Sequence, residues 1–218
     1  VKTIAVLVVN SDRGLCGSFN SNVVRAVVKF RQEHPDATIK LYIAGKNAYD
    51  YFKKRDMEIL NQWTSLGGKI TYLTAQKVSD TMTKAFLDGE FDELFVAYNQ
   101  FKSVAYQVPV VEKLLPLSFE DEEQKDAAGE TIITDYIFEP APEILLNELL
   151  PRYVIFSGYH ILLESAAGEH GARMVAMDNA TRSADDMIKK LTLNYNKARQ
   201  AAITTDLLDI VNGAEALK

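Results

Sequence analysis

The architecture of this chain follows from one stretch of its sequence, residues 174–205, which read MVAMDNATRSADDMIKKLTLNYNKARQAAITT. Apolar or small side chains recur in it at steps of three and four residues, which is the heptad repeat of a left-handed coiled coil. This seam contains Met174, Met177, Thr181, Ala184, Ile188, Leu191, Tyr195, Ala198, Ala202 and Thr205. Because alanine and threonine are frequent in the seam, the partner helix must approach closely. We therefore predict that this stretch forms one half of a coiled coil.

The helix that carries the seam is predicted to extend over residues 141–218. Glycine and proline are sparse there, and the exceptions are Pro142, Pro151, Gly158, Gly168, Gly171 and Gly213. Bends are expected at Pro151 and near Gly168–Gly171. Seventy helical residues span roughly 100 Å, about twice the width of the domain that precedes them. A helix folded back on its own domain is the alternative, and this length disfavours it.

Residues 1–140 are predicted to form an α/β domain, because short β-branched runs alternate there with helical patterns. The expected strands are residues 4–9, 39–44, 69–73, 93–98, 104–117 and 132–138, and the expected helices are residues 20–31, 47–54 and 78–86. Pro109 and Pro116 are typical of an edge strand. Residues 120–130 carry six acids and are interpreted as a solvated loop. A docking site for a basic partner is the less favoured alternative.

Composition excludes several classes of protein. The chain has 218 residues and a net charge of −6, which disfavours nucleic-acid binding through phosphate contacts. Cys16 is the single cysteine, so no internal disulfide can form. The longest apolar runs of the chain are shorter than the roughly 18 residues of a membrane span. No signal segment opens the sequence, and its first residue, Val1, suggests that an N-terminal piece is missing or was processed.

Residues 14–18, Gly-Leu-Cys-Gly-Ser, follow an expected strand and precede an expected helix. Phosphate-binding loops occupy this position in α/β folds. However, no Lys-Ser/Thr pair follows, and the glycine spacing differs from that of a dinucleotide site. We interpret the segment as a strand-to-helix turn with Ser18 or Asn20 as N-cap, and nucleotide binding is the less favoured alternative.

The sequence suggests no catalytic, cofactor-binding or metal-binding residues. Cys16 lacks an obvious base, because His34, His160 and His170 lie far from it in the expected fold, and we interpret it as a structural thiol. The histidines do not form a zinc motif. The paired acids Asp185 and Asp186 are interpreted as solvated charge.

The long helix carries two surfaces that need an explanation. Its central part has more bases than acids: Arg173, Arg182, Lys189, Lys190, Lys197 and Arg199 against Asp178, Asp185 and Asp186. This band is either a solvated face with i,i+4 pairs or a contact surface for an acidic partner. The end of the helix is strongly apolar: Ile203, Leu207, Leu208, Ile210, Val211, Ala214 and Leu217. It is expected to sit in an apolar sleeve.

Two segments resemble the gamma subunit of the F-type ATP synthase, the central rotor shaft. They are residues 11–22, SDRGLCGSFNSN, and residues 164–181, ESAAGEHGARMVAMDNAT, continued by YNKARQAAIT at 195–204. The resemblance covers essentially the whole chain and is weakest between about residues 45 and 135. It implies a Rossmann-like α/β domain between two long helices, which wind into an antiparallel left-handed coiled coil. The family's N-terminal helix, of roughly seventy residues, is absent from this sequence, and it would be the seam's partner.

The resemblance also assigns roles to individual residues. Beta-subunit contacts are implied for Lys189, Lys190, Lys197, Arg199, Gln200, Thr204 and Asp206. An apolar bearing inside the alpha–beta hexamer is implied for Ile203, Leu207, Leu208, Ile210 and Val211. Arg173, with Met174, matches a coupling motif. The ring of c subunits is expected to contact residues 142–150, and epsilon the α/β domain.

The implied function is that of an asymmetric rotor shaft, turned by a proton or sodium ring. The chain would itself catalyse nothing, bind no cofactor and not insert into the membrane. Its expected location is the cytoplasmic face of the bacterial inner membrane, with the mitochondrial matrix face less favoured. Two alternatives remain: a small α/β nucleotide-binding enzyme with a coiled-coil tail, and a coiled-coil scaffold without a rotary role.

Overall fold

A computed structural model describes residues 2–55, 57–64, 66, 70–117 and 139–216. The strand expected at 132–138 and the acidic loop expected at 120–130 lie outside these residues. The chain divides into two compact units, Val1–Met174 and Val175–Lys218. Because the first part of the long helix packs on the sheet, the first unit extends beyond the domain expected at residues 1–140.

A five-stranded mixed sheet forms the centre of the first unit. Its strands are β1 (Thr3–Val9), β2 (Thr38–Ala44), β3 (Glu58–Trp63), β4 (Glu93–Ser103) and β5 (Tyr106–Leu115). They lie in the order β3-β2-β1-β4-β5. The first four strands are parallel, with Ile4 opposite both Ile39 and Glu93, and β5 pairs antiparallel with β4. This is the strand order of a Rossmann-like half.

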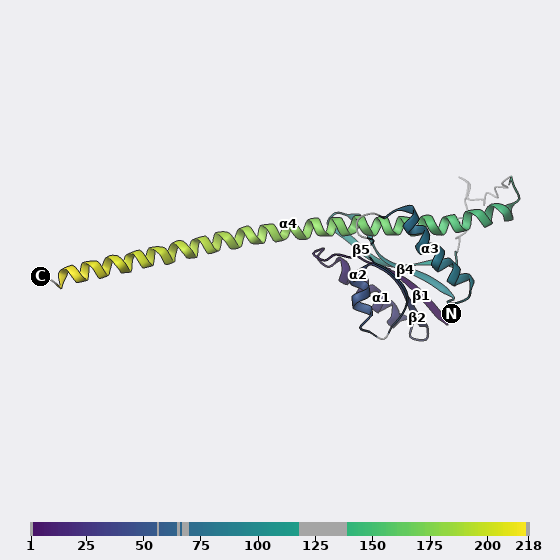
Figure 1. Ribbon diagram of the computed structural model, residues 1–218, viewed down its shortest axis with the longest axis horizontal. Coiled ribbons are helices and arrows are strands. Elements are labelled where there is room, and N and C mark those ends of the chain that lie inside the picture. The colour runs from purple at the N-terminus through teal and green to yellow at the C-terminus, as the bar shows by residue number, and fades with distance from the viewer. Residues whose placement is uncertain (1, 56, 65, 67–69, 118–138, 217–218) are drawn as a thin grey trace, which may run out of the picture. The chain divides into compact units, whose positions relative to one another are not determined.

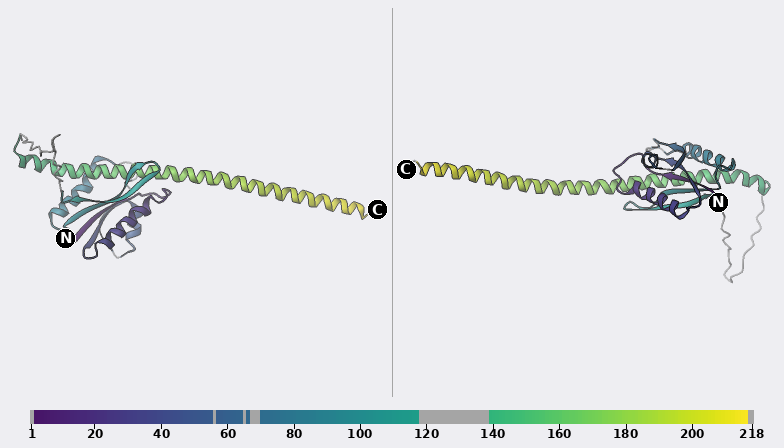
Figure 2. Two further views of the ribbon diagram at one scale, coloured as in Figure 1. Left: turned by 180° about the vertical axis from the view of Figure 1, so that it is seen from behind. Right: turned by 90° about the horizontal axis from the view of Figure 1, so that it is seen from below.

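Helices cover both faces of this sheet (Figures 1 and 2). On one face, α1 (Phe19–Glu33) and α2 (Lys46–Phe52) pack against Ile4, Val6 and Val8. On the other face, α3 (Tyr72–Leu87) and the first part of α4 (Pro142–Glu215) pack against Ala5, Leu7 and Val9. Alternate side chains of β1 thus serve two cores, which explains its continuous β-branched run.

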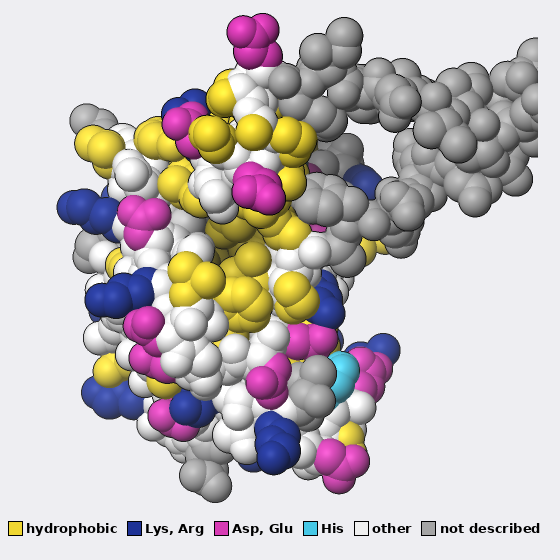
Figure 3. Space-filling view, turned by 90° about the vertical axis from the view of Figure 1, so that its right-hand side faces the viewer, with side chains coloured by type: hydrophobic (Ala, Val, Ile, Leu, Met, Phe, Trp, Pro, Cys, Tyr) yellow, Lys and Arg dark blue, Asp and Glu magenta, His cyan; other side chains and the backbone are white. Residues whose placement is uncertain are grey.

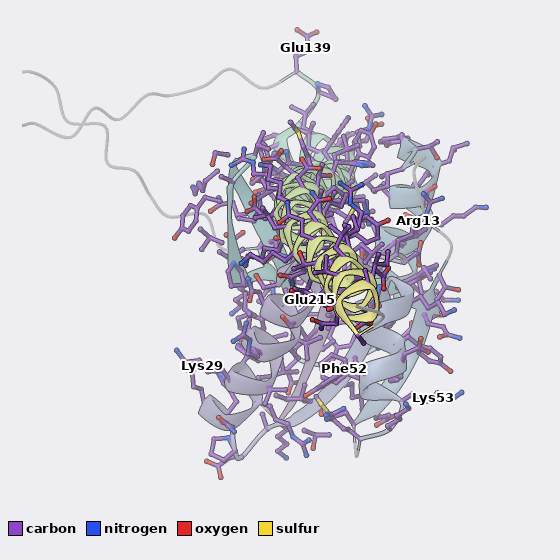
Figure 4. The ribbon with its side chains drawn as sticks, turned by 90° about the vertical axis from the view of Figure 1, so that its left-hand side faces the viewer. Arg13, Lys29, Phe52, Lys53, Glu139 and Glu215 are labelled. Carbon is purple, nitrogen blue, oxygen red and sulfur yellow. The ribbon has the colours of Figure 1, made fainter. Side chains whose placement is uncertain are left out.

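In the layer formed by α1 and α2, apolar side chains face the sheet and charged side chains face the solvent. Phe52 is fully buried and points into this layer, whereas the side chains of Lys29 and Lys53 point outward from its two margins (Figure 4). The core on this face is therefore closed by an aromatic ring at the end of α2.

Glycines let α4 approach the sheet layers closely. A Cβ on Gly158 would lie 2.7 Å from the Ser79 hydroxyl of α3. A Cβ on Gly168 would lie 3.2 Å from the Phe19 ring, and one on Gly171 would lie 3.1 Å from the Val104 carbonyl oxygen. These positions lie on the buried face of α4. Larger side chains there would push the helix off the domain.

Most of the expected elements are confirmed, including the strands at 4–9, 39–44 and 93–98, the edge strand with Pro109 and the helix from Pro142 onward. The strand expected at residues 69–73 is wrong. Thr71 is instead the N-cap of α3, and its hydroxyl oxygen accepts the Thr74 N–H at 3.3 Å. The third strand is Glu58–Trp63, whose polar, half-exposed pattern hid it in the sequence.

The second unit consists of the rest of α4. Among its described residues, 175–216, none is buried. A single helix of this length has no core of its own, so its apolar side chains need a partner.

Candidate functional site

The turn after β1 is the most densely hydrogen-bonded part of the first unit. The carbonyl oxygen of Arg13 accepts from Ser11 Oγ at 2.5 Å and from Asn47 Nδ2 at 3.2 Å. Asn20 Nδ2 lies 3.4 Å from the same oxygen. Asn20 belongs to α1 and Asn47 to α2, so this oxygen joins both helices to the end of β1.

The helix α4 reaches the same turn from the other side. Arg173 donates to the carbonyl oxygen of Gly14 at 3.3 Å and to Glu169 Oε1 at 2.7 Å. The side chains of this ion pair are 24% and 21% exposed, so it is largely shielded from water. The carbonyl oxygens of two successive residues thus accept from three helices.

The geometry argues against a phosphate-binding loop at residues 14–18. Carbonyl oxygens are gathered at the centre of this turn, whereas a phosphate site gathers N–H groups. Leu15 has a φ of 62° and is 76% exposed, so the turn presents an apolar side chain to its surroundings. Ser18 is the N-cap residue of α1, as expected, but its side chain makes no capping bond.

Cys16 is a structural thiol, as the sequence suggested. It is 2% exposed, and its sulfur accepts from Asn20 Nδ2 at 3.3 Å. His34 packs on Phe30 with ring centroids 4.2 Å apart, and His160 lies 3.4 Å from Glu164 Oε2. Within the described part of the chain, no cluster of histidine, cysteine and acidic side chains is arranged to hold a metal.

A cavity of about 250 Å³ lies beside the turn, at the carboxyl ends of β1 and β2. Ser165 of α4 lines it and is 3% exposed. The remaining lining residues are Val9, Asn10, Asp12, Arg13, Ala44, Leu66, Ile70, Leu162, Leu163, Ala166, Glu169, His170 and Arg173. The cavity thus opens between apolar strand ends and the polar end of the α4 segment in this unit.

The exposed side of α4 in the first unit carries several large apolar side chains. Leu149, Tyr153, Phe156 and Leu163 are each 41–57% exposed. Figure 3 shows hydrophobic side chains gathered on one face of this unit. With His160, Ala167 and His170, these four continue the steps of three and four upstream from Met174. The same spacing therefore predicts that the seam starts upstream of Met174, near Leu149.

In the second unit, the seam is exposed along its whole length. The exposed fractions are 39% for Met177, 61% for Ile188 and Leu191 and 67% for Tyr195, while Met174 at the end of the first unit is 68% exposed. The alanines Ala184, Ala198 and Ala202 are exposed as well. The residues expected to form a bearing, Ile203, Leu207, Leu208, Ile210 and Val211, are 51–67% exposed.

The basic band on α4 is partly neutralised. Arg182 pairs with Asp178 at 2.7 Å, and Lys189 pairs with Asp186 at 3.7 Å. Lys190, Lys197 and Arg199 form no ion pair with another described residue. Gln200 and Asp206 are exposed, and the Thr204 hydroxyl bonds back to the Gln200 carbonyl at 2.9 Å. Three positive charges close to the apolar end are thus unpaired among the described residues.

Sequence reasoning missed the contacts of the turn. Asn47 carried no sequence signal, because the Arg13 carbonyl oxygen that it bonds lies 34 residues away. The Arg173–Gly14 contact spans 159 positions and is equally invisible to local patterns. Arg173 itself was singled out, but not its contact with the turn.

An α/β domain that continues into one long helix with an unpaired heptad seam defines a stalk-type subunit. A family model described as ATP synthase matches residues 1–217. ATP synthase gamma chains of Anaeromyxobacter sp. (strain Fw109-5) and Pelotomaculum thermopropionicum are each 45% identical, and each match covers 100% of this chain and 74% of the relative. The chain therefore belongs to the ATP synthase gamma chain family.

Solved structures agree on the fold. A chain of the Euglena gracilis mitochondrial ATP synthase, solved as OSCP/F1/c-ring, has a TM-score of 0.70 and 22% identity, with 99% of this chain and 73% of that chain covered. A chain of the Tetrahymena thermophila mitochondrial ATP synthase central stalk and c-ring has a TM-score of 0.65 and 24% identity, with 83% and 77% covered.

Proposed function

We propose that this chain is the rotor shaft of an F-type ATP synthase, and that it catalyses nothing by itself. The observation that carries the proposal is the exposed seam of α4, which ends in free positive charges and an apolar tip, in a chain of the gamma family. A lone helix with this surface is not a stable end state in water. The surface is suited to a second helix, an acidic lever and an apolar sleeve.

The partners follow from these surfaces and from family membership. The seam would pair with an N-terminal helix, as in an antiparallel coiled coil. Lys189, Lys190, Lys197 and Arg199 would meet acidic segments of the beta subunits, with Gln200, Thr204 and Asp206 beside them. The apolar tip would turn inside the alpha–beta hexamer. The α/β domain and residues 142–150 would contact epsilon and the ring of c subunits.

The mechanism is differential binding. An asymmetric shaft presents different contacts to each of three beta subunits, and each orientation therefore stabilises a different conformer of each catalytic site. Ion flow through the ring turns the shaft and drives the sites through these conformers. The charges on α4 act on a given beta subunit only while they face it. The rotation angle of the shaft therefore sets the affinity of each catalytic site for nucleotide.

We place the complex on the cytoplasmic face of a bacterial inner membrane, since the relatives named above are bacterial. In the part of the chain that the structure describes, no helix is long and apolar enough to cross a bilayer. We expect the chain to reach the membrane through the ring of c subunits.

Replacing Arg199 and Gln200 together by alanine tests the contact assignment. We expect coupled ATP synthesis in membranes to fall severalfold while the complex still assembles. Arg31→Ala with Gln32→Ala is the matched control, because it changes the same exposed dipeptide on α1. Normal synthesis in the Arg199–Gln200 variant would contradict the assignment.

Copurification tests the wider proposal. The intact protein is tagged on the α/β domain, extracted gently from membranes and analysed by mass spectrometry. Alpha, beta and epsilon subunits should accompany it in a ratio of three to three to one. Recovery of the chain alone, or of self-pairs, would reject the rotor role and favour a scaffold.

A further inference from the structure

The turn at residues 13–17 occupies an unusual place in the fold. It lies after β1, between the two cores, and receives donors from α1, α2 and α4. Arg173, which supplies the α4 donor, is the next-to-last residue of the first unit. The turn is thus tied to α4 at the point where the helix leaves the domain.

Two observations show that the tie from α4 is built rather than incidental. Arg173 is fixed by Glu169, one turn earlier on the same helix, at 2.7 Å and largely out of water. Gly168 and Gly171 lie against Phe19 and Val104, so α4 is held close to the layer from which the turn projects. A guanidinium can bond a carboxylate and a carbonyl at once, because its donors form a planar fork.

We propose that residues 13–17 form a latch between the α/β domain and α4, with Glu169 and Arg173 as its positioning residues. This proposal rests on the proposed rotor function and gives the contact a mechanical role. Torque that enters through the domain must reach the part of α4 beyond Met174. The latch resists rotation of α4 about its own axis relative to the sheet. Packing on glycines alone would let α4 rotate about its axis, whereas the Arg173–Gly14 hydrogen bond can form at only one rotation of the helix.

The first test reads the latch without any reference to function. Cys16 is the single cysteine of the sequence, is 2% exposed and lies inside the turn. Its rate of maleimide labelling in the purified complex, followed by mass spectrometry of its peptide, reports opening of the turn. We expect Arg173→Met and Glu169→Gln to raise this rate by about tenfold and about threefold. An unchanged rate in Arg173→Met would overturn the proposal.

Charge reversal separates the latch from the ion pair alone. The double variant Glu169→Arg with Arg173→Glu keeps an i,i+4 pair, but residue 173 can no longer donate to Gly14. We expect labelling to stay fast in this variant and to be only partly slowed in Arg173→Lys, because a lysine ammonium keeps the charge but lacks the planar fork of the guanidinium. Wild-type labelling in the reversed pair would mean that the pair only stabilises the helix, which overturns the proposal. The matched control is Lys29→Glu with Glu33→Lys, an exposed i,i+4 pair on α1.

The second test asks whether the latch matters when the shaft transmits torque. ATP hydrolysis by the detached catalytic portion places no load on the domain, whereas ATP-driven ion pumping by the whole complex does. We expect Arg173→Met to leave unloaded hydrolysis within twofold and to lower the ions pumped per ATP severalfold. Fast Cys16 labelling with normal pumping would overturn the mechanical role. Failure of the rotor function itself would appear differently, as loss of the copurifying subunits from the wild-type chain.

Discussion

The two parts of α4 share one repeat but have opposite surroundings. Residues 142–174 bury Val154, Ile161 and Leu162 against the sheet and expose the seam on the other side. Among residues 175–216, no side chain is buried on any side. The first part is therefore held by its own domain, whereas the second depends on whatever covers the seam. Helical propensity alone does not stabilise either part enough to bear a load.

The largest expected effect comes from enlarging a glycine on the buried side. Gly171→Val would place its side chain against the Val104 backbone, with the Cβ already at 3.1 Å, and backbone cannot move aside cheaply. We expect the free energy of unfolding of the first unit to fall by about 3 kcal/mol. Gly213→Val is the control in the second part of α4, since nothing lies within 4 Å of its Cβ. Urea denaturation measures both, and equal losses would refute the contrast.

The next effect separates the seam from the rest of the exposed helix. Leu191 lies in the seam and Leu193 outside it, and both are 61% exposed in the structure. A buried lysine in a coiled-coil seam is costly, so we expect Leu191→Lys to destabilise the paired helices by about 2 kcal/mol. Leu193→Lys should change this value by less than about 0.5 kcal/mol. Thermal melting of helical circular dichroism in the assembled subunit tests this, and equal melting would place the seam elsewhere.

The sequence predicted correctly those helices and strands in which the spacing of apolar residues follows the pattern of buried side chains. The run from Ile4 to Val9 is buried on both faces, and the seam repeats without interruption from Met174 to Thr205. The prediction failed where a side chain bonds the backbone locally. Thr71 caps α3, so Tyr72 begins a helix despite its preference for strands. The strand Glu58–Trp63 has mixed polarity because it is an edge strand, and its position follows from pairing with β2 rather than from composition.

The candidate site divides in the same way. The seam, the basic band and the apolar tip are properties of one helix and could be read from spacing. The latch receives side chains from three helices, and no local pattern encodes Arg173 meeting the Gly14 carbonyl. The residues expected to contact beta subunits remain predictions, because their partners are other chains.

Alkaline pH should destabilise the first unit. Burial, and then the carboxylates of Glu112 and Glu164, raise the pKa of Tyr98 well above its usual value of 10. The folded state therefore holds the phenol proton more tightly, so stability falls as pH rises beyond about 10. At pH 11 the loss from Tyr98 is at most about 1.4 kcal/mol.

Chemical denaturation between pH 8 and pH 11 measures this loss. Tyr98→Phe should flatten the alkaline fall, although it also removes the hydroxyl bond to Glu112 at 3.2 Å and so lowers stability near neutral pH. Tyr195→Phe, at a 67% exposed position of the second unit, is the control and should leave the profile unchanged. A wild-type profile in the Tyr98 variant would assign the fall to other groups.

The smallest effect compares two ion pairs with the same spacing and length. Glu169–Arg173 and Asp178–Arg182 both measure 2.7 Å at i,i+4, but the first is 21–24% exposed and the second 57–74%. Exposed pairs on a helix contribute about 0.3–0.5 kcal/mol, because water screens them and ordering two side chains costs entropy. We expect Arg182→Gln to lower helix stability by no more than about 0.5 kcal/mol. In 0.5 M salt the variant and the wild type should be equally stable, because salt screens the exposed pair. Thermal melting at low and high salt measures this, and a larger, salt-insensitive loss would show that Arg182 is covered in the assembled subunit.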